Sequence, residues 1–434
     1  MRSPVLHSQR AISLLSSALI LYSLVAAAPL HAQTTSTAPN DRYLARAKRI
    51  LRETPLIDGH NDLPWRIRED TIARGNVDAY DLRKRTPGHT DLERLKRGMI
   101  GAQFWSVYTP GDYRDSGYAR VQLEQIEIAR RVIARYPDRL ALALSANDIR
   151  RDFKQRKIGS LLGLEGGHAI ENSLGALRAY YDLGVRYMTL THNVTLDWAD
   201  AALDSAKHNG LTPFGDSVVR EMNRLGMLVD LSHVSPGTMS DALNVSQAPV
   251  IFSHSGARAL VDVARNVPDS ILHRVTTNGG IVMIPFVTSF VSPAVYLYEQ
   301  STTRPAMRDL REKYGNDTVA INRAVKEWRA THPEPRATLS QVADQIEYVR
   351  KVAGVDHVGI GGDFDGITEV VLGLEDVSTY PALFAELARR GWSDSDLRKL
   401  AGENFLRVFA QAEAVAKRLQ LEPPRIHRVS RFRG

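Results

Sequence analysis

The chain has 434 residues, of which 43% are hydrophobic and 24% are charged, a composition that supports a large buried core and excludes a disordered or fibrous protein. It contains no cysteine, which excludes disulfides, thiolate metal sites, thiol nucleophiles and lipid attachment to an N-terminal cysteine. Much of the net charge of +7 lies near the two ends, and no basic stripe with interleaved aromatic residues lies between them, so we expect no binding to nucleic acid.

The first residues have the pattern of a secretory signal peptide. A basic start is followed by an apolar run over 11–27 and by small residues up to Ala32. The run is short for a bilayer span and a polar stretch follows it at once, which favours cleavage over a retained membrane anchor. We therefore expect a signal peptide over 1–32, a linker over 33–45, and an exported protein that is soluble in the periplasm or outside the cell.

Short apolar runs then alternate with longer amphipathic stretches, which is typical of βα repeats around a parallel sheet. Eight runs are candidate strands, namely 56–58, 102–108, 160–164, 185–190, 227–231, 250–253, 280–286 and 357–361. Helices are expected between them, for example over 118–135, 173–183, 214–225, 339–352 and 380–390. The sequence therefore predicts an α/β fold, a (β/α)8 TIM-type barrel over 46–415.

One segment, 287–336, interrupts this alternation. It is charged and aromatic, and it is too long for a simple βα loop. We expect a helical insertion near the C-terminal mouth of the barrel, and two interpretations stay open: a lid that acts in turnover, or a surface elaboration with no role in it. The last segment, 416–434, is expected to be a basic tail without the apolar stretch of a lipid-anchor signal.

Histidines and carboxylates follow several of the candidate strands. The carboxyl ends of the strands in a closed parallel barrel meet at one mouth, so these side chains are expected to converge there. His60 and Asp62 are two apart on an extended segment and point to the same face, although such a pair alone is more often a hydrogen-bonded core or turn pair. Glu165, His233 and His254 follow three further strands. Together these side chains form a candidate metal site.

Five ligands are too many for one catalytic zinc that keeps a position open for water, but they suit two metals that share a carboxylate. Glu165 is the natural bridge, with His60 and Asp62 completing one metal site and His233 and His254 the other. Nitrogen and oxygen donors without sulfur fit two Zn²⁺ per chain, and Mn²⁺ or Co²⁺ would be tolerated by the same donors. A hydroxide between the two metals would be the nucleophile.

The stretches that carry these residues resemble the motifs of the membrane (renal) dipeptidase family, a zinc-dependent peptidase branch of the amidohydrolase-like metal-dependent hydrolases. They are IDGHND at 57–62, LEGGH at 164–168, LTHN at 190–193, DLSH at 230–233, FSHS at 252–255, ARN at 264–266 and GGDFDG at 361–366. They span most of the chain, and as a set they are highly specific. A related branch has His-x-His on the first strand and a carboxylated lysine as the bridge, whereas Asp62 and Glu165 of this chain favour the dipeptidase branch.

The resemblance implies the same metal ligands and adds three residues. His192 and Arg265 would contact the substrate, and Asp363 would bind it and transfer the proton. In this scheme His192 also stabilises the oxyanion, and the planar donor fork of Arg265 holds the free carboxylate of a dipeptide. The neighbouring residues His168 and Asp365 are expected to support the site rather than to act chemically.

The expected activity is hydrolysis of the peptide bond of dipeptides by the metal-bridged hydroxide, and the resemblance extends this to dipeptides with a C-terminal D-residue. Two alternatives stay open: a related binuclear amidohydrolase that acts on β-lactams, N-acyl amino acids or lactones, and a non-catalytic protein that keeps the metal site. Mammalian members of the family are lipid-anchored and disulfide-linked. Because this chain has no cysteine, any homodimer would have to be non-covalent.

Overall fold

The computed structural model describes residues 41–111, 117–315, 317–421 and 423–424. The predicted signal peptide, most of the predicted linker and most of the basic tail lie outside these residues. Among the helices that are described, none combines the length and the apolar character needed to cross a membrane.

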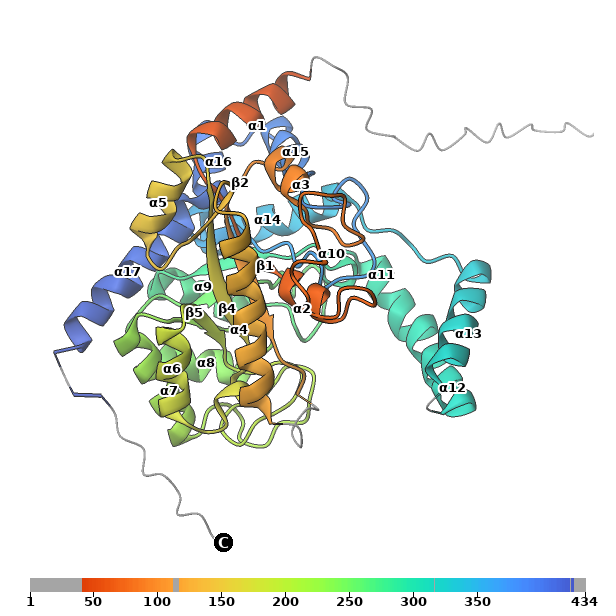
Figure 1. The fold of residues 1–434 in the computed structure, drawn as a ribbon, viewed down its shortest axis with the longest axis horizontal. Coiled ribbons are helices and arrows are strands. Elements are labelled where there is room, and N and C mark those ends of the chain that lie inside the picture. Colours follow the sequence, from red (N-terminus) through yellow and green to blue (C-terminus); the bar gives the residue numbers. More distant parts are fainter. Residues whose placement is uncertain (1–40, 112–116, 316, 422, 425–434) are drawn as a thin grey trace, which may run out of the picture. The chain divides into compact units, whose positions relative to one another are not determined.

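Eight parallel strands close into a barrel surrounded by helices (Figure 1). They are β1 (Leu56–Asn61), β2 (Ile100–Tyr108), β4 (Ile158–Glu165), β5 (Val185–Thr189), β6 (Leu228–Asp230), β7 (Ile251–Phe252), β8 (Ile281–Ile284) and β9 (Val358–Ile360). With the additional short strand β3 (Leu140–Leu142), the order in the sheet is β2-β1-β9-β8-β7-β6-β5-β4-β3, and pairing between β2 and β4 closes the ring. The predicted (β/α)8 TIM-type fold is confirmed, and each predicted strand corresponds to one strand of the barrel.

A ninth strand, β3 (Leu140–Leu142), was not predicted. It pairs in parallel with the start of β4, and in the described part of the chain β4 is its only partner, so it lies outside the closed ring. Its 3 residues are too few to produce a periodic apolar signal in the sequence.

Helices follow most of the strands and cover the outside of the barrel (Figure 1). They are α1 (Arg42–Glu53), α2 (Leu63–Arg68), α3 (Leu92–Arg97), α4 (Tyr118–Arg135), α5 (Ala146–Lys154), α6 (Leu174–Asp182), α7 (Pro213–Leu225), α8 (Pro236–Val245), α9 (Asp269–Asn278), α14 (Leu339–Ala353), α15 (Tyr380–Arg389), α16 (Asp394–Arg398) and α17 (Asn404–Leu419). Short 3-10 or π segments are η2 (Gly167–Ile170), η4 (Val355–His357) and η5 (Lys399–Glu403). Thus α1 begins within the predicted linker, and α17 continues past residue 415.

The sequence of α7 illustrates how local chemistry sets these bounds. The Thr212 side chain accepts a hydrogen bond from the backbone N–H of Gly215, and Pro213 stands in the first turn, where its missing N–H is harmless. Gly226 ends the helix with a φ of 84°, a conformation that glycine adopts without steric cost.

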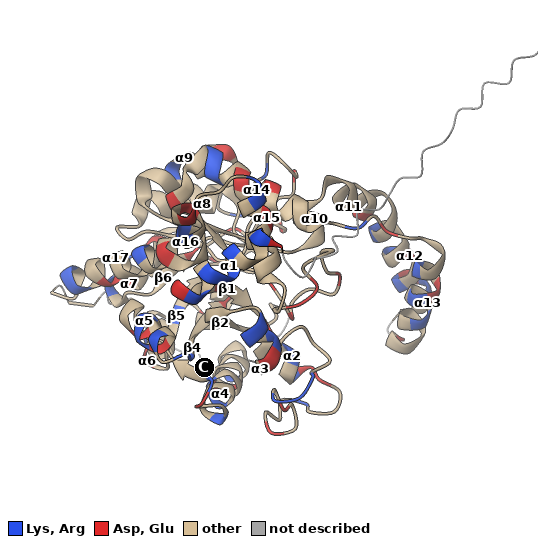
Figure 2. Cartoon of the chain, turned by 90° about the horizontal axis from the view of Figure 1, so that it is seen from above, with Lys and Arg blue, Asp and Glu red and all other residues tan. Residues whose placement is uncertain are grey.

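The segment 287–336 forms a helical insertion, as predicted. It contains α10 (Thr288–Val291), α11 (Pro293–Tyr298), the π segment η3 (Glu299–Thr303), α12 (Arg304–Tyr314) and α13 (Thr318–Thr331). Neither α12 nor α13 has a buried residue, and Figure 1 shows this pair extending away from the barrel. Basic and acidic residues both lie along α12 and α13 (Figure 2). The side chains of these two helices therefore contact water rather than a hydrophobic core.

The interior of the barrel is filled by apolar side chains from alternate strand positions. Ile57, Phe104, Leu161 and Tyr187 belong to this cluster, together with side chains of α17. The rings of Phe104 and Tyr187 lie 4.8 Å apart. Close-packed side chains below the mouth give the residues at the strand ends a rigid base.

Candidate metal centre

The five predicted metal ligands lie together at the mouth, with Glu165 in the middle. Nε2 of His233 and Nε2 of His254 lie 3.0 Å and 3.5 Å from Glu165 Oε1. On the other side, Nε2 of His60 lies 3.5 Å from Glu165 Oε2 and 3.3 Å from Asp62 Oδ2. All five side chains are buried. Glu165 therefore presents one oxygen to each half of the cluster, as a bridging carboxylate would.

Strand ends supply these side chains. His60 lies in β1 with Asp62 just after it, Glu165 is the last residue of β4, and His233 and His254 follow β6 and β7. The backbone of His233 has a φ of 69° in the left-handed region, which residues other than glycine rarely adopt. Strain of this kind is concentrated at functional sites, where the surrounding structure maintains it.

Each of the three histidines has its second ring nitrogen held by a polar side chain. The pairs are His60 Nδ1 with Tyr187 Oη at 2.8 Å, His233 Nδ1 with Asn193 Oδ1 at 3.0 Å, and His254 Nδ1 with Ser253 Oγ at 2.8 Å. This arrangement leaves Nε2 of each ring facing the carboxylates, and metal-binding histidines are held in the same way. In particular, His60 Nε2 is buried without a hydrogen-bond partner among the described residues, so a cation would satisfy it.

Sequence reasoning missed these supporting residues. Besides the three partners above, Ser106 Oγ donates to Glu165 Oε2 at 3.0 Å, and Asp230 accepts from Ser253 Oγ at 2.6 Å. Ser106 and Tyr187 stand inside strands that are buried along almost their whole length. A polar group in such a position requires a partner, which is the signal that could have identified both.

His192 and Asp363 also lie within reach of a cation. Ligand atoms fall within 4.8 Å of one another in three groups, namely His60–Glu165–His254, Glu165–His192–His233 and His60–Asp62–Asp363. His192 Nε2 is 3.8 Å from Glu165 Oε1, and Asp363 Oδ1 is 3.9 Å from His60 Nε2. His254 is thus near His60 as well as near His233, whose Nε2 lies 2.9 Å from that of His254.

Burial changes the proton affinity of these groups. It lowers the pKa of His192, His233 and His254 well below 6.5, so that their rings are neutral and can bind a cation. Burial opposes the charge on His60 too, but Tyr187 and the carboxylates of Glu165 and Asp62 raise the pKa of His60 well above 6.5. Burial also raises the pKa of Asp363 well above 3.8, which suits a group that carries a proton.

Arg265 is a buried guanidinium at the edge of the cluster. Its side chain lies over the ring of Phe290 in α10, at 5.2 Å, and its Nε and Nη2 have no hydrogen-bond partner among the described residues. Burial lowers the pKa of Arg265 to about 10, and the carboxylates of Glu165 and Asp363 oppose that change. Unsatisfied donors on a buried cation favour an anionic ligand, such as a carboxylate, at this position.

Comparison with known proteins agrees with this geometry. The sequence profile of the membrane dipeptidase family (peptidase family M19) matches residues 44–423. The chain belongs to this family. It is therefore a metallo-dipeptidase, a hydrolase of peptide bonds, and its His, Glu and Asp clusters are compatible with the metal site of a metal-dependent family.

Solved structures show the same fold. The probable dipeptidase PvdM from Pseudomonas aeruginosa is 26% identical to this dipeptidase with a TM-score of 0.73, and the alignment covers 86% of this chain and 99% of that chain. A metallo peptidase from Rhodobacter sphaeroides, liganded with a phosphinate mimic of the dipeptide L-Ala-D-Ala, is 24% identical with a TM-score of 0.67. That alignment covers 83% of this chain and 99% of that chain.

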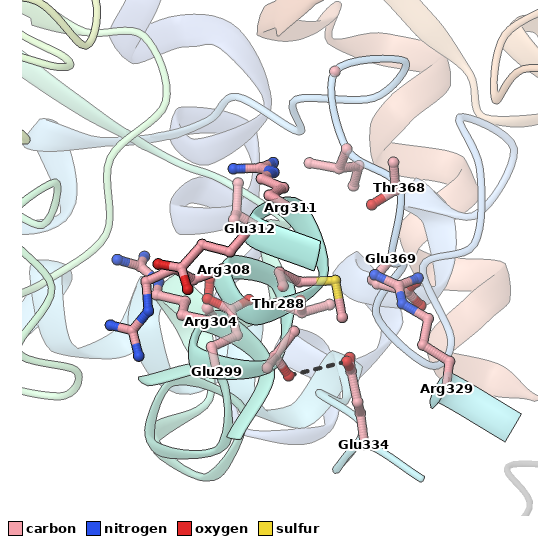
Figure 3. A pocket seen from close by; sticks show the side chains of 16 residues that line it. Thr288, Glu299, Arg304, Arg308, Arg311, Glu312, Arg329, Glu334, Thr368 and Glu369 are labelled. Atoms are coloured by element: carbon pink, nitrogen blue, oxygen red, sulfur yellow. Dashed lines mark hydrogen bonds and ion pairs between the residues drawn. The ribbon is translucent and has the colours of Figure 1, made fainter. Parts of the chain in front are cut away.

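The insertion of this dipeptidase and the loop after β9 line a cavity of about 750 Å³ (Figure 3). Gly366 connects the cavity to the metal centre, because it lines the cavity and a Cβ at this position would lie 2.2 Å from Asp62 Oδ2. Arginines and glutamates, among them Arg304 and Glu334, face the cavity together. The insertion thus forms one wall of a space that borders the metal centre.

The remaining polar neighbours support the loops of the dipeptidase. His168 Nε2 lies 2.6 Å from the carbonyl oxygen of Thr109. Asp365 Oδ1 accepts from the backbone N–H of His89 at 2.6 Å, and the backbone N–H of Asp365 donates to His89 Nδ1 at 3.0 Å. Asp58 Oδ1 accepts from the backbone N–H of Gly362 at 2.8 Å, so it ties β1 to the loop that carries Asp363.

Proposed function

We propose that this dipeptidase binds two Zn²⁺ per chain and hydrolyses dipeptides that end in a free carboxylate, including those with a C-terminal D-residue. The observation that carries the proposal is the position of Glu165, whose two oxygens face different histidines. Sulfur-free donors support zinc, with Mn²⁺ or Co²⁺ as substitutes. The bound mimic of L-Ala-D-Ala in the Rhodobacter sphaeroides structure supports the extension to D-residues.

Two bound cations would make water a nucleophile near neutral pH and polarise the scissile carbonyl. The side chains of this chain supply the remaining steps. Asp363, whose pKa burial raises, passes a proton to the leaving amine, and neutral His192 donates a hydrogen bond to the oxyanion. Arg265 binds the terminal carboxylate of the substrate through its unsatisfied donors. A longer peptide would place that carboxylate elsewhere, which restricts the substrate to dipeptides.

The metal content and a pair of substrates test this proposal. Elemental analysis of the purified protein should give about two zinc ions per chain, and the loaded enzyme should cleave L-Ala-D-Ala and L-Ala-L-Ala. Arg265→Ala should lose kcat/KM for the dipeptide but retain it for the dipeptide amide, which has no terminal charge. An equal loss for both substrates would contradict the role of Arg265, and an inactive enzyme with two metals would contradict the proposed function.

We also propose that the dipeptidase is exported and that its signal peptide is removed after Ala32. The basic, apolar and small-residue regions of 1–32 support this location. Fractionation of cells expressing the full chain should place the protein outside the cytoplasm, with an N-terminus at Gln33. A cytoplasmic protein that retains Met1 would refute it.

A further inference from the structure

A second cavity, of about 640 Å³, lies at the end of the barrel opposite to the metal centre. Its lining includes the ends of α1 and α5 and the starts of β2 and β4. Strand β4 begins in this cavity at Ile158 and ends at Glu165, and at about 3.3 Å per residue the two ends are roughly 23 Å apart. The cavity is therefore separate from the site where peptides would be hydrolysed.

The charged residues that line this cavity are all basic. They are Arg52, Lys96, Arg139, Arg156 and Lys157. None of these five forms a side-chain ion pair among the described residues, and Arg139 donates only to the carbonyl oxygen of Leu92, at 3.2 Å. Two carboxylates next to this rim are held by other arginines. Asp152 attracts Lys157 but is hydrogen-bonded to Arg151, and Asp138 attracts Arg139 but is paired with Arg83 at 2.8 Å. The positive charge of the cavity is therefore largely uncompensated by the protein.

The floor of the same cavity is apolar, with Leu51, Ile100, Phe153 and Ile158 on its surface. Two further lining residues, Met99 and Arg156, have φ values of 60° and 59° in the left-handed region. Each lies just after the end of a helix, α3 or α5, where a left-handed residue closes the last turn. These two helix ends place the basic side chains around the apolar floor.

We propose that this cavity binds a phosphorylated ligand that has an apolar body. A phosphate monoester carries about −1.5 to −2 charges at pH 7, which neutralises a multiply basic cavity better than a single carboxylate does. Guanidinium forks match phosphate oxygens, and the apolar floor accommodates the rest of the molecule. The volume also falls within the range of roughly 300–1,000 Å³ typical of small-molecule sites.

The cavity beside the metal centre offers a contrast. Its lining combines four arginines with four glutamates, and Arg329 is paired with Glu369 at 2.7 Å. That mixed lining has no net preference for an anion. The basic lining at the opposite end of the barrel favours an anion, and the binding of a phosphorylated ligand there does not depend on the proposed dipeptide chemistry.

Titration calorimetry of the full metal-loaded chain with phenyl phosphate tests the proposal. The double variant Lys96→Ala/Arg156→Ala removes two exposed cations from the rim. Both side chains would make charge-assisted contacts with the phosphate, so affinity should fall at least tenfold. The matched control, Arg323→Ala/Lys326→Ala, removes two exposed cations from α13 and should bind like the unaltered chain. Dipeptide hydrolysis should be the same in all three proteins.

Two further measurements identify the source of the phosphate. Binding of phenyl phosphate in solution indicates a free small molecule. Co-sedimentation only with vesicles that contain phosphatidic acid, and not with phosphatidylcholine alone, indicates a lipid headgroup. The proposal is overturned if benzoate binds as well as phenyl phosphate, if neither phosphate source binds, or if the α13 variant loses as much affinity as the cavity variant. If the unaltered, metal-loaded chain binds phenyl phosphate but does not hydrolyse dipeptides, that result contradicts the proposed function and not the phosphate site.

Discussion

The substitution Tyr187→Phe isolates the support of one metal ligand. Tyr187 is fully buried, and its Oη lies 2.8 Å from His60 Nδ1 and 3.3 Å from the carbonyl oxygen of Gly59. Phenylalanine keeps the ring, so the contact with Phe104 is retained. Gly163 leaves room for the ring in both proteins, since a Cβ there would lie 2.0 Å from Tyr187 Cζ. Only the hydroxyl group is lost.

The expected effect follows from the environment of that hydroxyl. A buried N–H on His60 left without an acceptor costs about 1–3 kcal/mol. Removal of a residue that orients a metal-binding histidine lowers metal affinity about 10- to 100-fold, which is about 1.4–2.7 kcal/mol. The two ranges agree. The loss should fall mainly on the metal nearest His60 and Asp62.

Competition against a chelator measures this loss directly, and activity at saturating zinc should recover most of its original value. Tyr136→Phe is the matched control, because Tyr136 is also buried and its Oη accepts from the backbone N–H of Leu82 at 2.8 Å, away from the mouth. It should lower the free energy of unfolding and leave metal affinity unchanged. The reasoning is refuted if Tyr187→Phe binds both metals as tightly as the unaltered chain, or if the control loses the same affinity.

Three other changes test the site and the core. Gly366→Ala should lower kcat/KM, because the new Cβ would lie 2.2 Å from Asp62 Oδ2 and displace that side chain. Steady-state kinetics measure the loss, and the zinc content shows whether Asp62 still binds metal. Burial holds the pKa of His254 below 6.5, so the unfolded metal-free chain takes up a proton that the folded chain refuses as pH falls below 6.5. The contribution of His254 to stability is therefore complete above pH 6.5 and should decline below it by about 1.4 kcal/mol per pH unit per proton. His254→Asn should reduce this slope in urea unfolding, and an unchanged slope would contradict the prediction. Phe104→Ala should cost about 3–5 kcal/mol of unfolding free energy, and a loss below 1 kcal/mol would argue against its place in the packed interior.

Much of the site could be predicted because a parallel barrel brings all strand ends to one mouth. Apolar runs predicted the strands, and Glu165, His233 and His254 were selected because each follows one of these runs. No distance between the residues was needed for this selection. The insertion was recognised as helical because its length and charge do not suit a loop. Its direction away from the barrel was not predicted, since no apolar face of α12 or α13 specifies a partner.

The supporting residues could not be predicted from spacing, because their contacts cross between strands. Tyr187 of β5 reaches His60 of β1 through the barrel interior, a contact that depends on register and on the room left by Gly163. Asn193 reaches His233 across two neighbouring loops. Sequence patterns specify which face a residue occupies, whereas these contacts depend on how the whole ring of strands is staggered.

The charge balance of the mouth argues that cations are part of the folded structure. Glu165 and Asp62 are buried carboxylates, and a buried charge left without compensation is strongly destabilising. His233 and His254 add no positive charge, because burial lowers the pKa of each ring well below 6.5, so among the described residues only Arg265 and His60, whose pKa Tyr187 and these carboxylates raise, offset them. Divalent cations held by the histidine Nε2 atoms together with Glu165 and Asp62 would complete this balance and, at about 1,000 times their Kd, stabilise the fold by about 4.1 kcal/mol per site. Metal binding and folding of the mouth should therefore be strongly coupled.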